Sequence, residues 1–294
     1  MGKKEYYYGS HVGISKNGII GAIDEIVKYN GNFIQIFITN PKARKTIKRS
    51  NEELATINHY AKFTKVKLVI HAPYLLNFAH EFKKDSWSII SLMDHLDTCS
   101  KIGALGVVVH SGKYLHMDKS EAIENMYQNL KYCLDNSPEN TKILLETPCG
   151  QGTELGGRLE EFRIIYNKFS EQDKKRLRIC VDTCHVFAAG YDLSDPDKIK
   201  QFIKTFDTII GWKYVDLIHL NDSRTILNSH LDRHELLDEG HIGLKGLSVI
   251  IKFAYKSGIP LILETPGGYP VEIPIIRKIM YKKNCETLLG LVCF

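Results

Sequence analysis

The feature that most constrains the fold is a repeated pair of segments. Eight times along the chain, a short apolar run typical of a β-strand precedes a longer segment with apolar residues at helical spacing. The runs are YYYGSHVG at 6–13, NFIQIFI at 32–38, VKLVIHAPY at 66–74, LGVVVHSG at 105–112, KILLETPCGQG at 142–152, CVDTC at 180–184, YVDLIHLND at 214–222 and PLILETPGG at 260–268.

Several of these runs, such as LVI, GVVV and LIL, are apolar without alternation, as in strands buried on both faces of a parallel sheet. Strands that alternate with helices indicate βαβ units, and eight units predict a closed (β/α)8 TIM barrel of the α/β class. A doubly wound open sheet is the alternative. It usually has a glycine-rich phosphate turn after its first strand, and YYYGSHVG does not match that pattern. No linker or shift in composition divides the chain, so we expect one domain over residues 1–294.

Charge and cysteine content restrict the partners and the compartment. The formal net charge of +5 permits an anionic partner but does not require one. The seven cysteines include no CxxC pair, and the N-terminal MGKKEYYYG lacks the apolar core of a signal peptide. We therefore expect reduced thiols in an intracellular protein. The sequence does not distinguish cytoplasm from nucleus, and it does not exclude a viral particle. No apolar run approaches the ~18 residues that a membrane helix needs, so no membrane partner is expected.

Two segments fall outside the repeat. The connection from Leu220 to about Gly243 shows no obvious helix or strand, and long loops of a barrel often carry binding and chemistry. The C-terminal NCETLLGLVCF, residues 284–294, is apolar and is expected to pack onto the body of the protein or a partner chain.

Six successive runs end in a residue type that binds metals. In a TIM barrel the C-terminal ends of the strands meet at one mouth, where active sites lie. The six residues are His71, His110, Glu146, Asp182, His219 and Glu264. His185 follows closely after one run, and Asp232 and His234 of the DRH sequence face the same way if this segment is extended. A single histidine at a strand end is more often structural, but six metal-binding residue types in succession at the same position predict a metal site, and the other three bring the candidates to nine.

The charge of this set indicates more than one cation. Four carboxylates in one mouth would repel each other, and two or three divalent cations would offset their charge and attract an anionic substrate. Imidazole and carboxylate ligands without thiolate favour Zn²⁺, with Mn²⁺ or Fe as alternatives. Nine ligands exceed one tetrahedral site, which predicts a cluster. Cys184 is a further possible ligand, although a small buried hydrophobic role is the preferred interpretation.

The motifs HAPYLLNFA, VVVHSG, LLETPCGQG, CVDTCHVFAAGYD, IHLNDS, DRHE and LILETP resemble those of the endonuclease IV family of apurinic/apyrimidinic (AP) endonucleases. The resemblance extends from GSHVG to LILETP, in order. It implies a trinuclear zinc site in which Glu146, the expected catalytic residue, bridges two ions. By this resemblance, His71, His110 and Glu146 hold one zinc. Asp182, His219 and Glu264 complete the second, and His185, Asp232 and His234 hold the third.

The resemblance also implies the activity. The expected reaction is hydrolysis of the phosphodiester 5′ to an abasic site in double-stranded DNA, leaving a 3′-hydroxyl and a 5′-deoxyribose phosphate, as part of base excision repair. Removal of blocking groups from 3′ ends is the accompanying activity of the family, and the expected form is a monomer.

Recognition of the damage is expected from loops around the metals. Tyr74 and Leu75 match the side chains that the family inserts where the base is missing, which replaces lost stacking and stabilises a kink. Where many members carry an arginine after FTKN, this chain has ITNPKAR, which places Lys42 at that position. A lysine holds a phosphate but lacks the planar fork of arginine. Further candidates for phosphate contact are Arg44, Arg224, Arg233 and Lys245.

Two other functions are consistent with a barrel that carries acidic residues and histidines. A sugar isomerase or epimerase of the xylose-isomerase type needs only one or two metals, which would leave His185 and the DRH sequence without a role. A catalytically silent barrel that binds damaged DNA or a partner predicts gaps in the ligand set, and the sequence has none.

Overall fold

The computed structural model describes residues 5–14, 17–44 and 47–281, and within this range the chain forms a closed barrel of eight parallel strands. The strands are β1 (Tyr8–His11), β2 (Phe33–Ile36), β3 (Lys67–His71), β4 (Val107–Val109), β5 (Ile143–Glu146), β6 (Leu177–Asp182), β7 (Val215–His219) and β10 (Leu261–Leu263). Each strand pairs with its sequence neighbour, and β1 pairs with β10 to close the ring. The predicted TIM barrel is therefore confirmed. The prediction of one domain over 1–294 extends beyond these residues and stays a prediction.

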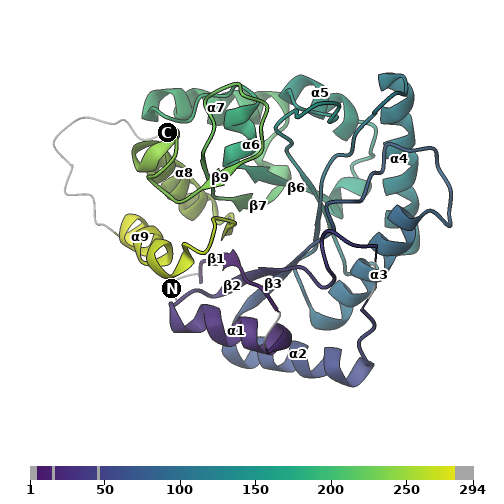
Figure 1. Ribbon diagram of the computed structural model, residues 1–294, viewed down its shortest axis with the longest axis horizontal. Coiled ribbons are helices and arrows are strands. Elements are labelled where there is room, and N and C mark those ends of the chain that lie inside the picture. Colours follow the sequence, from purple (N-terminus) through teal and green to yellow (C-terminus); the bar gives the residue numbers. More distant parts are fainter. Residues whose placement is uncertain (1–4, 15–16, 45–46, 282–294) are drawn as a thin grey trace.

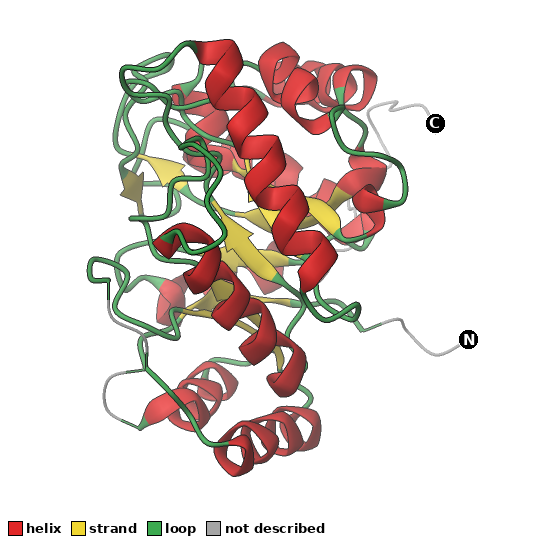
Figure 2. Ribbon diagram, turned by 90° about the vertical axis from the view of Figure 1, so that its right-hand side faces the viewer, coloured by secondary structure: helices red, strands yellow, loops and turns green. Residues whose placement is uncertain are grey.

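Helices form an outer ring around the strands (Figure 1). They are α1 (Gly18–Lys28), α2 (Asn51–Thr64), α3 (Trp87–Ile102), α4 (Lys119–Asn136), α5 (Leu159–Tyr166), α6 (Thr183–Ala188), α7 (Pro196–Ile209), α8 (Gly243–Ser257) and α9 (Tyr269–Tyr281). The view turned by 90° shows the strands as an inner layer beside the helices (Figure 2). No helix of the described ranges is long and apolar enough to cross a membrane.

Local sequence signals fix where several helices begin. The Ser50 hydroxyl accepts a hydrogen bond from the Glu53 amide at the start of α2, and the Asp118 carboxylate accepts from the Ser120 and Glu121 amides at the start of α4. These side chains satisfy amides that have no partner inside the helix. Gly103 ends α3 with a φ of 70°, a left-handed conformation that glycine adopts without steric cost.

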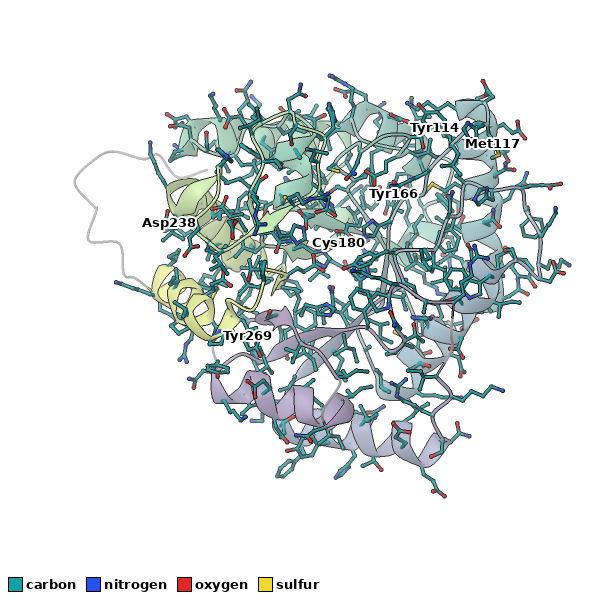
Figure 3. The ribbon with its side chains drawn as sticks, viewed as in Figure 1. Tyr114, Met117, Tyr166, Cys180, Asp238 and Tyr269 are labelled. Atoms are coloured by element: carbon teal, nitrogen blue, oxygen red, sulfur yellow. The ribbon has the colours of Figure 1, made fainter. Side chains whose placement is uncertain are left out.

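The interior of the barrel contains a layer of apolar side chains. This cluster comprises Phe33, Val69, Val108, Leu144, Cys180, Leu217 and Ile262. All seven come from strands, and the alternate strand residues, such as Leu68 and Ile70, belong to the separate cluster that includes the helices, so the seven point into the barrel. Cys180 lies near the middle of the helix ring in Figure 3. The one barrel strand not represented in this cluster is β1, which has Gly9 at the corresponding position. A Cβ at Gly9 would lie 1.7 Å from the Phe33 carbonyl oxygen.

The structure corrects one expectation and leaves another outside its range. The connection from Leu220 to Gly243 does contain regular structure, because β8 (Asp222–Ser223) and β9 (His234–Glu235) pair as a small antiparallel hairpin. Strands of two residues are too short to give a periodic sequence signal. The apolar segment NCETLLGLVCF lies outside the described residues.

Candidate metal centre

The alternation of side chains along the strands explains the position of the site. Successive residues of a strand point to opposite faces, so a residue two positions after an interior residue points to the same interior. Counting two positions from each member of the interior layer, with Gly9 for β1, gives His11, Gln35, His71, His110, Glu146, Asp182, His219 and Glu264. The strands therefore carry a polar layer at their C-terminal ends, directly above the apolar one.

The nine sequence-predicted ligand residues come together in three groups. In each group, one potential ligand atom per residue lies within 4.8 Å of the others. The groups are His71, His110 and Glu146; then Glu146, Asp182, His219 and Glu264; and then His185, Asp232 and His234. Glu146 belongs to both the first and the second group, so these two groups share its carboxylate.

The carboxylate of Glu146 presents its two oxygens in different directions. Its Oε2 lies 3.3 Å from the Nε2 atoms of both His71 and His110. Its Oε1 lies 3.1 Å from His219 Nδ1, and that nitrogen also lies 3.0 Å from Glu264 Oε2. The two oxygens of one side chain thus face two separate sets of ligands.

The third group depends on α6 and on the β8–β9 hairpin. The Asp182 carboxylate caps α6 by accepting from the His185 amide at 2.8 Å, so a residue of the second group fixes the helix that carries His185. The Asp232 Oδ1 atom lies 3.2 Å from the Nε2 atoms of both His185 and His234. His185 Nδ1 donates to the Thr147 carbonyl at 2.9 Å, which leaves Nε2 free to bind a cation.

The chemistry of the buried atoms fits divalent cations. His110 Nε2 and His185 Nε2 are buried and make no hydrogen bond within the described residues, although each lies 3.3 Å or less from a carboxylate oxygen. Asp182 is fully buried and Glu146 is 2% exposed, and buried carboxylates are costly unless paired with a positive charge. Imidazole nitrogens and carboxylate oxygens that converge in this way are typical ligands of Zn²⁺.

The electrostatics of the cluster separate its carboxylates. Burial alone would raise the pKa of Glu146, but the imidazoles of His110 and His219 hold it well below its usual range. Burial raises the pKa of Asp182. Burial would lower the pKa of His234, but the hydrogen bond to Asp232 and the charge of Asp182 raise it to about 9. A cation that binds in the third group must therefore displace a proton at neutral pH.

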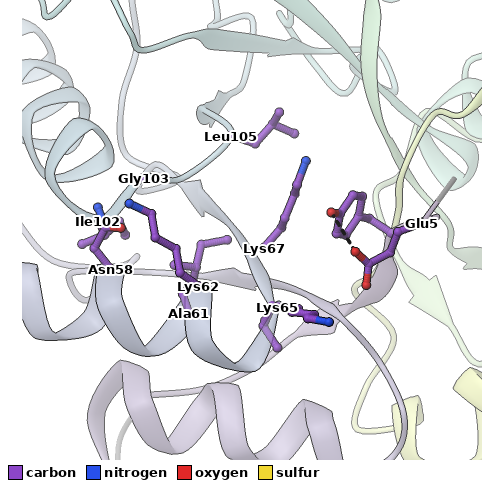
Figure 4. A pocket seen from close by; sticks show the side chains of 12 residues that line it. Glu5, Asn58, Ala61, Lys62, Lys65, Lys67, Ile102, Gly103 and Leu105 are labelled. Carbon is purple, nitrogen blue, oxygen red and sulfur yellow. Dashed lines mark hydrogen bonds between the residues drawn. The ribbon is translucent and has the colours of Figure 1, made fainter. Parts of the chain in front are cut away.

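A separate cavity of about 490 Å³ lies at the opposite end of the barrel (Figure 4). It is lined by residues at the N-terminal ends of strands, such as Lys67 at the start of β3 and Leu105 before β4. Lys67 Nζ lies 4.1 Å from the centre of the Tyr7 ring. None of the nine ligand residues lines this cavity, so it is distinct from the candidate metal centre.

Comparisons with known proteins identify the family. The family described as xylose isomerase-like TIM barrel matches residues 23–283. A protein of Halothermothrix orenii named "Probable endonuclease 4" is 37% identical over 268 residues, which cover 88% of this chain and 92% of that protein. The apurinic-apyrimidinic endonuclease 1 of Saccharomyces cerevisiae is 31% identical over 296 residues, covering 97% of this chain and 79% of that protein. This chain belongs to the endonuclease IV family. The crystal structure of endonuclease IV from Thermus thermophilus has a TM-score of 0.81 at 28% identity, covering 94% of this chain and 100% of that one.

The side chains that the endonuclease IV resemblance assigns to DNA binding lie near the ligands or on a nearby loop. Tyr74 is 51% exposed, and its ring centre lies 5.6 Å from that of the ligand residue His71. Leu75 beside it is 45% exposed. Lys42 is exposed on the loop after β2, and its amide donates to Asn40 Oδ1. Exposure and neighbouring residues alone do not test a contact with DNA. The three DNA-binding assignments therefore stay predictions.

The remaining basic candidates differ in their surroundings. Arg44 lies 5.3 Å from the centre of the Trp87 ring, a cation–π contact that ties the β2 loop to the start of α3. Arg224 pairs with Glu235 at 2.8 Å, and Lys245 lies 3.3 Å from an oxygen of Asp195. Arg233 is exposed next to two ligand residues.

Sequence reasoning missed residues that hold the ligands in place. Gln35 Nε2 donates to Glu264 at 2.5 Å, and its Oε1 accepts from His219 Nε2 at 2.8 Å, which leaves His219 Nδ1 facing the ligand set. Asn221 donates to Asp182 Oδ2 at 2.7 Å and accepts from the Glu264 amide at 2.8 Å. An isolated polar residue inside the apolar run NFIQIFI was the available signal for Gln35.

Cys184 is buried beside the third group. A further set of potential ligand atoms joins it with Asp182 and His234. Burial raises the pKa of its thiol to about 12, so in the metal-free protein it carries its proton and resembles a small apolar residue.

Proposed function

We propose that this protein is a metal-dependent AP endonuclease of DNA repair. It hydrolyses the phosphodiester 5′ to an abasic site in double-stranded DNA and removes blocking groups from 3′ ends in base excision repair. The observation that carries the proposal is the geometry of Glu146, whose two oxygens face two ligand groups while a third group lies beside them. Its relatives include an apurinic-apyrimidinic endonuclease.

The nine ligand residues would hold three ions, which we infer to be Zn²⁺, with Mn²⁺ as an alternative at one or more positions. When bound, the ions supply Lewis-acid polarisation of the phosphodiester and of the attacking water. Glu146 would be a ligand of both the first and the second ion. His185, Asp232 and His234 would fix the third beside them.

The protein residues then account for binding and orientation of the substrate. The four carboxylates of the mouth would repel a phosphate in the metal-free protein, so the same residues make DNA binding dependent on metal. Tyr74 and Leu75 project from the loop that follows His71, and we infer that they enter the duplex at the missing base. This insertion would hold the adjacent phosphodiester over the ligand groups.

A sugar isomerase or epimerase is the second candidate, because the matching family is described as xylose isomerase-like. Such enzymes need only one or two metals at the strand ends. The third group lies off the barrel strands, on α6 and on the β8–β9 hairpin with its connecting loop, and would have no role in that chemistry. The exposed apolar pair at Tyr74 and Leu75 would also lack a function towards a small polar sugar.

The direct test is cleavage of a duplex that contains one synthetic abasic site, with metal analysis of the same sample. Glu146→Ala removes the shared carboxylate and should lower cleavage at least roughly 1000-fold, equivalent to about 4 kcal/mol of transition-state stabilisation. Its circular dichroism spectrum should stay that of the native protein.

A matched control is Glu161→Ala on α5, which removes a partly buried glutamate paired with Lys119 at 2.8 Å, outside the three ligand groups. This variant should cleave at the native rate. If Glu146→Ala cuts abasic DNA as fast as the control, the bridging role is wrong, and if the native protein with bound metal leaves abasic DNA intact, the proposed function is wrong.

A further inference from the structure

Asp222 is a fully buried carboxylate outside the nine ligand residues, and backbone amides surround it. Its exposed fraction is 0%. The basic residue nearest to it in sequence, Arg224, pairs with Glu235 instead. Five amides donate to its two oxygens: those of Ser223 (2.8 Å) and Ile242 (2.9 Å) to Oδ1, and those of Asp238 (3.1 Å), Gly240 (3.3 Å) and Gly243 (3.1 Å) to Oδ2. Hydrogen bonds from amides to a charged acceptor are stronger than those between neutral groups.

These bonds connect three parts of the chain near the third ligand group. Asp222 begins β8, which pairs with β9 so that Ser223 lies opposite the ligand residue His234. Segment 238–243 contacts this hairpin through the His241 amide, which donates to the Ser223 carbonyl at 2.8 Å, and it leads into α8. Asp238 lies on the α8 side of the molecule in Figure 3. The carboxylate therefore ties the root of the hairpin to the start of α8.

The space around the carboxylate is closed. A Cβ added at Gly240 would lie 2.4 Å from Asp222 Oδ1 and 2.5 Å from the Ser223 carbonyl oxygen. Both values are below any real contact distance, so the segment reaches the carboxylate only because residue 240 is glycine. A second buried carboxylate, Glu272 of α9, accepts from the amide of Leu237, the residue just before this segment, at 2.8 Å.

The three ligand groups differ in how much they depend on this arrangement. The first two groups are built from residues at the ends of barrel strands, which the sheet itself fixes. In the third group, Asp232 and His234 lie on the hairpin, which is held to the barrel by β8 and by the segment around Asp222. Loss of the carboxylate bonds would therefore displace Asp232 and His234 before any other ligand.

We propose that Asp222 is a positioning residue that sets the binding of the third ion, by fixing the hairpin that presents Asp232 and His234. The inference deepens the proposed function, on whose three ions it rests. It predicts that the third ion can be lost while the two ions that share Glu146 stay bound.

The test is the metal content of Asp222→Asn. Asparagine keeps the shape of the side chain but replaces one acceptor oxygen with an NH₂ group, which would face amide donors. The native protein, dialysed with Zn²⁺ and freed of excess metal, should hold three ions per chain. The variant should hold two, with a circular dichroism spectrum unchanged, and cleavage of abasic DNA should fall. The metal-free proteins are then titrated with Zn²⁺ in competition with a coloured chelator. The native protein should bind three equivalents of Zn²⁺ tightly, and Asp222→Asn should bind two.

A matched control is Asp216→Asn at the start of β7. Asp216 is also a largely buried carboxylate and accepts from Lys142 at 2.6 Å and Arg178 at 2.8 Å, but it lies at the other end of the same strand as the ligand His219. It should keep three ions. Gly240→Ala is the second variant, because it displaces the segment without changing the carboxylate, and it should also hold two ions.

Each outcome decides the proposal. Three ions in Asp222→Asn, or the loss of all three, would overturn the local role of Asp222. Failure of both Asp222→Asn and Gly240→Ala to fold would also overturn it, because the carboxylate would then support the whole barrel. Fewer than three ions in the native protein would refute the three-ion assignment and this inference with it. A native protein with three ions that leaves abasic DNA intact would refute the proposed activity alone.

Discussion

At the scale of single residues, the ligand set brings several carboxylates of like charge close together. Glu146 and Asp182 are both buried in one cluster, yet the imidazoles around Glu146 lower its pKa while burial raises that of Asp182. The metal-free protein therefore reduces its internal repulsion by holding protons on some ligands. Binding of cations replaces those protons, so metal affinity is linked to pH.

This linkage gives a prediction for His234. Its pKa is raised to about 9, so its imidazole is charged at pH 7 and becomes neutral only above pH 9. Because a cation needs the neutral imidazole, affinity at the third group should weaken as pH falls below 9, by about tenfold per pH unit from this proton alone. Zinc titrations at pH 6.5 and 7.5, by calorimetry in two buffers of different ionisation enthalpy, should show this change and the release of a proton. Equal affinity at the two pH values, without proton release, would contradict the assignment.

The same scale explains what the sequence could predict. Residues such as His71 and Glu264 were found because metal-binding residue types recur at the ends of apolar runs, and the strand period then places them on one face. Gln35 and Asn221 were missed because an amide has no fixed role until its neighbours are known. Asp222 was missed for a related reason, since its partners are backbone amides of a segment that sequence periodicity does not describe.

At the scale of elements, the barrel supplies fixed positions and the loops supply the variable parts. The two-residue strands β8 and β9 were not predicted, although they present Asp232 and His234, because their pairing depends on the fold of the segment between them. The loop after β3 is the second such element. It follows directly after the ligand His71 and carries two exposed side chains, Tyr74 and Leu75, near its start.

The β3 loop leads to a prediction for Tyr74. Replacing it with alanine removes an aromatic ring that we infer to stack in place of the lost base, and such stacking is worth about 1–3 kcal/mol. Tyr74→Ala should therefore weaken binding to an abasic duplex by about tenfold or more, with a smaller effect on an intact duplex of the same sequence. Fluorescence anisotropy with both duplexes measures the difference. Phe63→Ala, which removes a 77% exposed aromatic ring from α2, should change neither value. Equal losses on both duplexes would argue against insertion.

At the scale of the whole molecule, the apolar layer inside the barrel supports the polar layer above it. Leu144 is fully buried in this layer, two residues before the shared ligand Glu146. Leu144→Ala should lower the free energy of unfolding by about 2–5 kcal/mol, because it loses buried apolar surface and leaves a cavity. Urea denaturation measures this change. Ile164→Ala, at a 61% exposed position of α5, should stay within about 0.5 kcal/mol of the native protein, and a similarly small effect at Leu144 would show that the layer is loosely packed.

The pairing of β1 with β10 also bears on how the protein is synthesised. Ser10 Oγ donates to the Leu263 carbonyl at 2.9 Å, and Tyr6 donates to the Ile259 carbonyl at 2.7 Å, so the first strand finds its second neighbour only in the last one. During synthesis on the ribosome, one edge of β1 therefore stays unpaired until about residue 263 has emerged. Premature termination upstream of Leu261 would release a polypeptide with two open sheet edges and an incomplete set of ligands, a substrate for chaperones and proteases.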